Sequence, residues 1–336
     1  MTSYRFIQLD VFTEEPFAGN ALAVFPEAEG LSDDAMMKIA REMNLSETVF
    51  VLKPEAGQST DSKQPTAEPG KADPQAQPAA PTVLRRLRIF TPAREIPFAG
   101  HPIVGTWNAL AREGIVPLPE GGNGWTRIHQ ELGIGVLPVD IEFKDGAPVQ
   151  VVMTQGKFQI VREIDDLHEQ AEIARALGLA IEDLDETLPI QVISTGLPFL
   201  AVPIRALTDL RRCRVNASLL TEIYQAVGGT GCEAFTRETI EIGASRAHAR
   251  MFAPGDNIPE DPATGSAAGA LGAYLVHHGA SNAEPVEGRV RFVIEQGDFI
   301  HRASRINLDV KGTAGSIEET RVGGPSVVVA KGEVFV

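Results

Sequence analysis

Four polar residues of this chain could together move a proton on a small molecule: Glu47, His101, Asp261 and Ser266. A carboxylate can remove a proton from carbon and return it, and a histidine or a second carboxylate can donate another. Each of these residue types is more often structural than catalytic when it stands alone. Chemistry is therefore indicated only if the positions of the four residues bring them together.

The chain carries one motif twice, which indicates two related halves. Residues 88–97, RIFTPAREIP, return as residues 250–259, RMFAPGDNIP. The next matching positions are Gly100-His101 in the first half and Gly265-Ser266 in the second. His101 and Ser266 thus occupy equivalent places, each after a glycine whose missing side chain lets a ligand approach the backbone.

Glu47 is expected between a helix and a strand. Ser32 can cap a helix that ends near Asn44, and a β-branched and aromatic strand follows at 49–52. Junctions of this kind often display active-site groups. Ser46, directly before Glu47, is a candidate for substrate binding.

The two repeated junctions each open a helix. Pro102 and Gly114 bracket the first helix, and small residues form the second from Ser266 to about residue 278. If the junctions face each other, the free N–H groups of both first turns form an anion site suited to a substrate carboxylate. These groups would also stabilise the enolate-like charge that develops when an adjacent carbon loses a proton. Burial there would raise the pKa of Glu47 towards neutrality, which improves it as a base.

Other chemistries fit the sequence less well. Neither the GxxxxGKS/T loop of nucleotide-binding proteins nor a GxGxxG after a strand is present. Residues 265–269, GSAAG, place serine away from the central position that a serine hydrolase requires. The seven histidines lack metal-ligand spacing, and Cys213 and Cys232 form no CxxC pair. The sequence therefore predicts side-chain chemistry with no cofactor and no metal.

Composition argues against several partners. The chain has 336 residues, 43% of them hydrophobic, and a formal net charge of −15, which repels nucleic-acid phosphates and anionic membranes. The N-terminus lacks the apolar core of a signal peptide, and no apolar run approaches the roughly 20 residues that span a bilayer. We expect a cytoplasmic protein that binds a small carboxylic acid, with neither nucleic acid nor a membrane as partner.

Residues 53–82 differ from the rest of the chain. They contain six prolines and six alanines but no aromatic and no large aliphatic side chain. Such a segment cannot contribute to a core and is predicted to be a disordered insertion in a surface loop. A lid over the site is the alternative.

Three segments together resemble the phenazine-biosynthesis PhzF-like isomerases, which have the diaminopimelate-epimerase fold. The segments are REMNLSET at 41–48, RIFTP and FAGHP at 88–92 and 98–102, and EDPATGSA at 260–267. The resemblance implies an α+β fold with two pseudo-symmetric domains, each a barrel-like sheet around a central helix, and a homodimer. The domains are expected at 1–125, with the C-terminal strand 322–336 as a candidate addition, and at 126–321.

The resemblance also implies residue roles. In the family the glutamate of the Asn-Leu-Ser-Glu segment moves a proton between ring carbons without a cofactor, which gives the acid/base role to Glu47. The family's substrate-binding residues fall on His101, Asp261 and Ser266, with backbone contacts from Gly100 and Gly265.

Three functions stay open. The leading hypothesis is a cofactor-independent isomerase that shifts a proton along a small unsaturated or cyclic amino or hydroxy acid, similar to dihydro-hydroxyanthranilate. An epimerase or racemase would have to use Glu47 with Asp261 or His101, because His101 and Ser266 stand where the amino-acid epimerases of this fold have a cysteine pair. The third alternative is a small-acid binding or interaction protein of the same fold.

Overall fold

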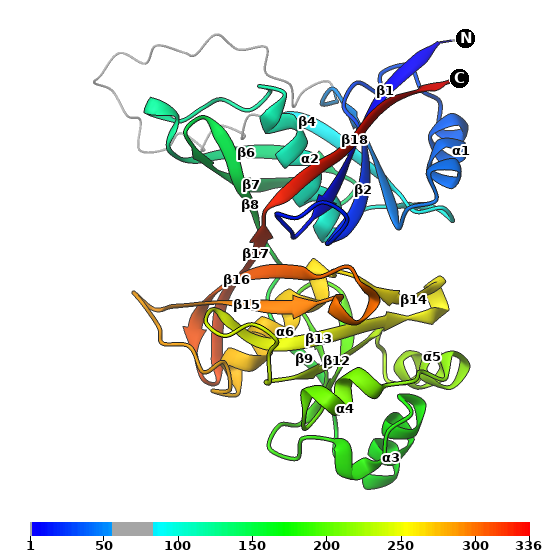
Figure 1. Cartoon of the computed structure of the whole chain (residues 1–336), viewed down its shortest axis with the longest axis vertical. Helices are drawn as coiled ribbons and strands as arrows, with labels where there is room; N and C mark the ends of the chain where they lie inside the picture. The colour runs from blue at the N-terminus through cyan, green and yellow to red at the C-terminus, as the bar shows by residue number, and fades with distance from the viewer. Residues whose placement is uncertain (1, 56–82) are drawn as a thin grey trace, which may run out of the picture.

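The computed structural model describes residues 2–55 and 83–336 (Figure 1). The insertion predicted at 53–82 lies outside the described residues except for 53–55. The elements before residue 155 are β1 (Ser3–Val11), β2 (Asn20–Phe25), α1 (Asp33–Met43), β3 (Glu47–Leu52), β4 (Val83–Phe90), β5 (Glu95–Ile96), α2 (Gly100–Arg112), β6 (Gly124–Leu132), β7 (Gly135–Lys144) and β8 (Ala147–Thr154). The later elements are β9 (Gln159–Ile164), α3 (Leu167–Ala176), β10 (Ile190–Ser194), β11 (Pro198–Pro203), α4 (Leu207–Arg212), α5 (Ala217–Ala226), β12 (Cys232–Thr236), β13 (Ser245–Ala253), β14 (Ile258–Asp261), α6 (Gly265–His277), β15 (Arg289–Gln296), β16 (Ser304–Thr313), β17 (Ser316–Gly324) and β18 (Ser326–Phe335).

Two bodies stand one above the other in Figure 1, each built of strands around one helix, α2 above and α6 below. The mixed α+β class and the two-body architecture predicted from the sequence are confirmed. The last strand returns to the first body, where β18 pairs antiparallel with β1 from Ser3↔Phe335 to Val11↔Ser326. Below it, β17 pairs with β8 and joins the two bodies.

Strands β6, β7 and β8 belong with the first body. β6 lies parallel to β4, and β7 and β8 continue the sheet from it. A boundary at residue 125 would fall inside β6 and would separate this strand from β4, its parallel neighbour in the first body. We therefore propose that the first domain comprises residues 1–154 with β18, in place of the boundary expected after residue 125.

The same strand order recurs in both bodies. β2 and β3 are parallel neighbours, as are β11 and β12. β3, β4 and β5 continue antiparallel, as do β12, β13 and β14. The repeated sequence motif is therefore a repeated structural unit.

An arginine clamps each copy of the repeated motif. Arg88 donates two hydrogen bonds to Glu95, at 2.8 and 2.6 Å, and Arg250 donates two to Glu260, at 2.9 and 2.6 Å. Each guanidinium also lies over an aromatic ring two residues along its strand, at 5.2 Å from Phe90 and at 5.0 Å from the second ring, Phe252. The clamps hold the turn that leads from β4 or β13 to the following helix.

The two central helices are buried along almost their whole length, so their first turns are held rigidly. Close packing explains their small residues. A Cβ added at Gly105 would lie 2.6 Å from side-chain carbons of Leu22 and Val11, and one at Gly272 would lie 2.8 Å from Leu308 Cδ1. Larger residues would push the helices, and with them the site, out of place.

Helix α1 has the caps expected from the sequence. The Ser32 side chain accepts a hydrogen bond from the Ala35 N–H, and Asn44 ends the helix in the left-handed conformation at φ 49°. The chain then turns directly into β3, whose first residue is Glu47. No helix in the described part of the chain is long and apolar enough to cross a membrane.

Candidate active site

Glu47 and His101 meet inside the first body. Glu47 begins β3, His101 stands in the first turn of α2, and Glu47 Oε2 lies 3.4 Å from His101 Nε2. The side chains are 13% and 6% exposed. Neither of these two atoms has a hydrogen-bond partner among the described residues. Buried polar atoms without partners are uncommon in proteins, and they mark this pair as a place where a ligand is expected.

Burial shifts the pKa values of this pair in opposite directions. It raises the pKa of Glu47 to about 7, against a smaller lowering effect of Ser46. It lowers the pKa of His101 to about 4, against a raising effect of the Asp261 charge. Near neutral pH the imidazole is therefore uncharged, and Glu47 is divided between its acid and its carboxylate. A group in this state can both take up and return a proton.

Asn20 connects the predicted residues to one another. Its side-chain N–H₂ donates to Asp261 Oδ1 and to the Ala263 carbonyl, both at 2.9 Å, and lies 3.5 Å from His101 Nδ1. Its side-chain oxygen accepts a hydrogen bond from the Ser46 hydroxyl at 3.2 Å. Sequence reasoning missed Asn20, and the available signal was its place after Gly19 at the start of a strand that the second half echoes.

Asp261 comes from the second body and is 6% exposed. Its carboxylate also accepts a hydrogen bond from the Thr264 hydroxyl, and its backbone carbonyl accepts one from Gln296 at 2.7 Å. Burial raises the pKa of Asp261 to about 6, with the nearby His101 lowering it and Glu47 raising it. Thr264 stands within the EDPATGSA segment but was given no role there, and Gln296 was missed because it lies outside the motifs that the sequence offers.

The first turns of α2 and α6 face each other across the two bodies. A Cβ added at Gly100 would lie 3.4 Å from the Ser266 N and 3.5 Å from the Gly265 Cα. The residues before these helices, Ala99 and Thr264, make no side-chain cap. The first-turn N–H groups are thus free of side-chain caps at the place where the sequence predicted an anion site.

All seven predicted site residues therefore lie at one junction. Glu47, His101 and Asp261 are linked through Asn20 and by their close approach, Ser46 bonds to Asn20, and the remaining three are Gly100, Gly265 and Ser266. Within the described ranges, no three His, Cys, Asp or Glu side chains group in a way that could hold a metal ion.

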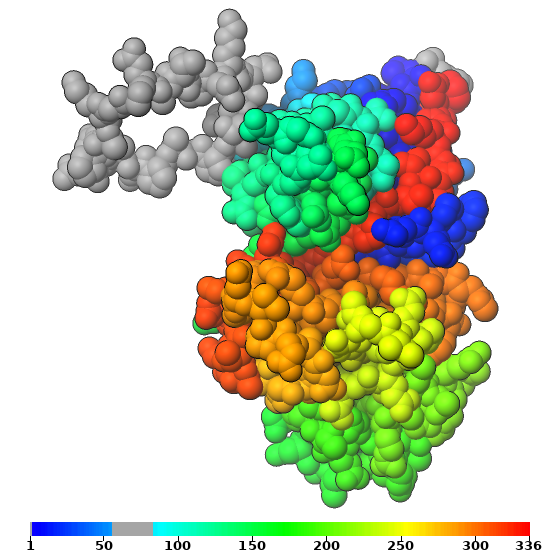
Figure 2. Space-filling view, turned by 60° about the vertical axis from the view of Figure 1, so that its left-hand side comes forward, coloured from blue at the N-terminus to red at the C-terminus, as the bar shows by residue number. Residues whose placement is uncertain are grey.

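The N-terminal segment contacts the second body beside this junction. Arg302 of the second body donates to Asp10 Oδ1 at 2.7 Å and to the Gly19 carbonyl at 2.9 Å. In Figure 2 the blue N-terminal segment lies against the orange second body at this boundary. Arg302 thus ties the two bodies together next to Asn20.

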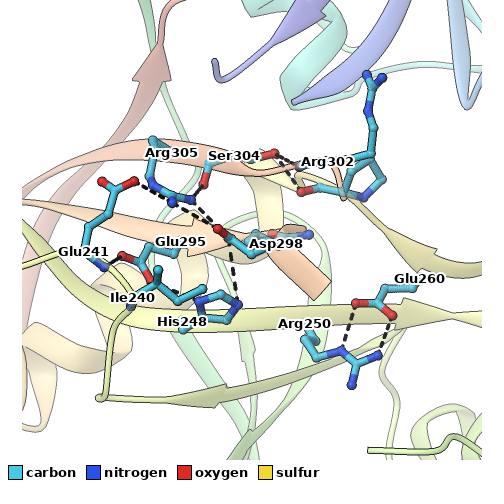
Figure 3. A network of polar contacts seen from close by, with 12 residues as sticks. Ile240, Glu241, His248, Arg250, Glu260, Glu295, Asp298, Arg302, Ser304 and Arg305 are labelled. Carbon is cyan, nitrogen blue, oxygen red and sulfur yellow. Dashed lines mark hydrogen bonds and ion pairs between the residues drawn. The ribbon is translucent and has the colours of Figure 1, made fainter. Parts of the chain in front are cut away.

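A second buried polar cluster lies within the second body, around His248 and Glu295 (Figure 3). His248 Nδ1 is 2.9 Å from Glu295 Oε2, and Glu295 also accepts the N–H groups of Ile240 and Glu241. Burial alone would raise the pKa of Glu295, but these hydrogen bonds together lower it. The cluster holds a loop to β13 and β15 and is structural.

Known proteins are similar to this chain in both sequence and fold. The family model PhzC-PhzF, described as phenazine biosynthesis-like protein, matches residues 9–332. An uncharacterised isomerase of Clostridium acetobutylicum is 33% identical over 98% of both chains. The trans-2,3-dihydro-3-hydroxyanthranilate isomerase of Pseudomonas aeruginosa is 31% identical over 99% of both.

Solved structures agree with these relatives. The crystal structure of a PhzF-family phenazine biosynthesis protein from Bacillus anthracis has a TM-score of 0.80 and 25% identity over 100% of both chains. A hydroxyproline epimerase from Agrobacterium vitis, with a TM-score of 0.58 and 12% identity over 99% of this chain and 91% of that one, shares the fold alone. The predicted diaminopimelate-epimerase-like fold is therefore confirmed. The chain belongs to the PhzC-PhzF family of phenazine biosynthesis-like proteins and is an isomerase.

Proposed function

We propose that Glu47 moves a proton between carbons of a small unsaturated or cyclic acid, without a cofactor. The observation that carries this proposal is the approach of Glu47 Oε2 to His101 Nε2 at 3.4 Å, inside a junction that leaves the two side chains only 13% and 6% exposed. With its pKa raised by burial to about 7, Glu47 takes the proton as a carboxylate and returns it as an acid. His101 orients the substrate and can serve as a second hydrogen-bonding group.

The facing helix starts supply the site for the substrate carboxylate. The free first-turn N–H groups of α2 and α6 would bind it, and Gly100 and Gly265 allow it to approach the backbone. The same positive ends stabilise the negative charge that builds up on the substrate when a neighbouring carbon loses its proton. Asp261 and Ser266 then fix the remaining polar groups of the substrate.

The substrate class follows from the relatives. The Pseudomonas aeruginosa relative is named for the isomerisation of trans-2,3-dihydro-3-hydroxyanthranilate, a cyclic unsaturated acid with amino and hydroxyl groups. We propose a substrate of this kind for the present chain, and a homodimer as its functional form.

The cysteines do not support a thiol-based epimerase. Burial raises the pKa of Cys213 to about 11 and that of Cys232 well above its usual range. Neither thiol is at a helix opening, where His101 and Ser266 stand. Proton removal therefore falls to a carboxylate. Glu47 is the candidate, because its Oε2 and the neighbouring His101 Nε2 are buried atoms without a hydrogen-bond partner among the described residues.

The test follows turnover of small cyclic amino and hydroxy acids, including trans-2,3-dihydro-3-hydroxyanthranilate, by NMR. Glu47→Gln should lower kcat by about 10²–10⁴-fold, because glutamine cannot exchange a proton at neutral pH. The matched control is Glu42→Gln on the exposed face of α1, which should keep full activity. Unchanged turnover by Glu47→Gln would remove Glu47 from this role.

A further inference from the structure

A second buried glutamate faces the same junction from the other body. Glu233 lies in β12 with an exposed fraction of 0%. Neither of its carboxyl oxygens has a hydrogen-bond partner among residues 2–55 and 83–336. Burying a carboxyl group without a hydrogen-bond partner costs free energy of folding. A hydrogen-bonding group from outside the described part of the chain is therefore expected beside Glu233.

Strand register shows which way Glu233 points. Glu233 is opposite Met251 in β13, and Met251 is opposite Asp261 in β14. Directly opposite residues of antiparallel strands project from the same face. Glu233 and Asp261 are therefore on one face, and two strand spacings put their backbones about 10 Å apart.

The face that carries Glu233 looks towards the first turn of α6. Phe235, two residues further along β12, contacts Tyr274 of α6 with ring centroids 5.7 Å apart. Met251, the neighbour of Glu233, packs in one cluster with Ala267 near the start of α6. Glu233 thus stands beneath the helix start at which the substrate carboxylate is proposed to bind.

The two buried glutamates lie on the same face of matching strands but not at the same position. Phe90 is opposite Thr48 and Phe252 is opposite Cys232, so Glu233 stands two residues further along its strand than the position that matches Glu47. Leu22 of β2 is opposite Glu47 across a parallel pair, and Ala201 of β11 is opposite Glu233 across the matching pair. Leu22 and Ala201 both pack in the cluster that surrounds the central helices. Glu47 has His101 beside it, whereas Glu233 has no such partner in the described residues.

We propose that Glu233 is a specificity-determining residue that accepts hydrogen bonds from the amino group of the substrate. This inference rests on the proposed function, since it assumes that a small acid binds between the two helix starts. Three buried carboxyl groups, those of Glu47, Asp261 and Glu233, then surround the substrate and favour a cationic ammonium group. The charge of Asp261, after burial, contributes to raising the pKa of Glu233. The chain should therefore prefer amino acids to the corresponding acids that lack nitrogen.

The experiment measures binding of two inert probes by calorimetry at pH 7: trans-2-aminocyclohexanecarboxylate and cyclohexanecarboxylate, which differ only in the amino group. The wild type should bind the amino acid about tenfold more tightly or better, the effect expected of hydrogen bonds that involve a charged group. Glu233→Met, which keeps the side-chain volume but removes the acceptor, should abolish this preference and leave binding of cyclohexanecarboxylate unchanged. Glu233→Gln, which keeps one acceptor oxygen, should retain part of the preference.

The matched control is Thr106→Val in α2, which also removes a buried hydrogen-bonding group without a partner among the described residues. It should keep the wild-type preference. A Glu233→Met protein that still prefers the amino acid by the wild-type factor overturns the inference, and so does a wild type that binds both probes equally or binds neither. The probes are not turned over, so their binding does not depend on proton transfer by Glu47. A failure of the Glu47 mechanism would appear only in the turnover assay and would not affect this binding comparison.

Discussion

Glu47 and His101 show how one cause can produce opposite results in two neighbouring side chains. Burial disfavours the charged form of each, which makes Glu47 a weaker acid and His101 a weaker base. With a pKa of about 7 for Glu47 and about 4 for His101, the proton resides on the carboxyl group rather than on the imidazole. The pair therefore differs from a conventional ion pair, and its proton is available for transfer.

The stability of the Glu47→Gln protein should depend on pH relative to that of the wild type. The pKa of Glu47 rises from 4.5 to about 7 on folding. The stability linked to its protonation is present below pH 4.5 and is lost as the pH rises through 7. Glutamine has no such loss, so the free energy of unfolding of the variant should gain on the wild type by roughly 3 kcal/mol at most between pH 5 and pH 8.

Urea unfolding of both proteins at pH 5, 6, 7 and 8 measures this difference. A difference that stays constant over this range would show that Glu47 ionises in the folded state as readily as in the unfolded one. That result would contradict the burial argument without reference to any substrate.

The sequence singled out residues that the structure brings together at the junction, and it missed the residues that connect them. Glu47, His101 and Ser266 could be found because they stand at junctions or in a repeated motif. Asn20 could not, because an amide next to a glycine is typical of an ordinary turn. Glu233 could not either, because only the register of β12 against β13 shows that it faces the site.

At the scale of elements, the two arginine clamps are alike in geometry but differ in burial. The side chains of Arg250 and Glu260 are 9% and 12% exposed, whereas those of Arg88 and Glu95 are 15% and 41% exposed. Removing one partner of a buried ion pair leaves the other charge buried, which is far more costly than the loss of an exposed pair.

Glu260→Met should therefore lower the free energy of unfolding by about 3 kcal/mol. The matched variant in the first body, Glu95→Met, should cost about 1 kcal/mol or less. Chemical denaturation of the two variants measures both values. Equal losses would mean that the buried clamp contributes no more than the partly exposed one.

Local elements were predicted more accurately than their partners. The helix expected to end near Asn44 and the strand expected at 49–52 agree closely with α1 and β3. Helix caps, prolines and runs of β-branched or aromatic residues are local signals, so they can be recognised in the sequence alone. The pairing of β6 with β4 joins segments far apart in the sequence. No local pattern of residues indicates such a pairing, which is why the sequence alone suggested a boundary at residue 125.

At the scale of the whole molecule, the site is complete only when the two bodies are together. Glu47 and His101 come from the first, while Asp261 and Ser266 come from the second. Arg302 crosses between them to Asp10 and to Gly19, the residue before Asn20. We expect this contact to stabilise the closed arrangement.

Arg302→Met should weaken binding of the substrate about tenfold, because closure would have to be driven by the ligand itself. The matched control is Arg305→Met in the same region. The Arg305 side chain bonds Asp298 and Glu241 within the second body, so its loss should leave substrate affinity near that of the wild type. The KM values of both variants and their small-angle scattering test this, and equal KM values for the two variants would argue against a closing role for Arg302.

The most direct test of the central claim is proton exchange at carbon in heavy water, followed by NMR for the wild type and Glu47→Gln with the substrate identified in the turnover assay. The wild type should place solvent deuterium at the carbon that receives the proton, while Glu47→Gln should bind the same acid with little change in Kd but show no deuteration. Deuteration at the wild-type rate by Glu47→Gln would contradict the claim that Glu47 carries the proton.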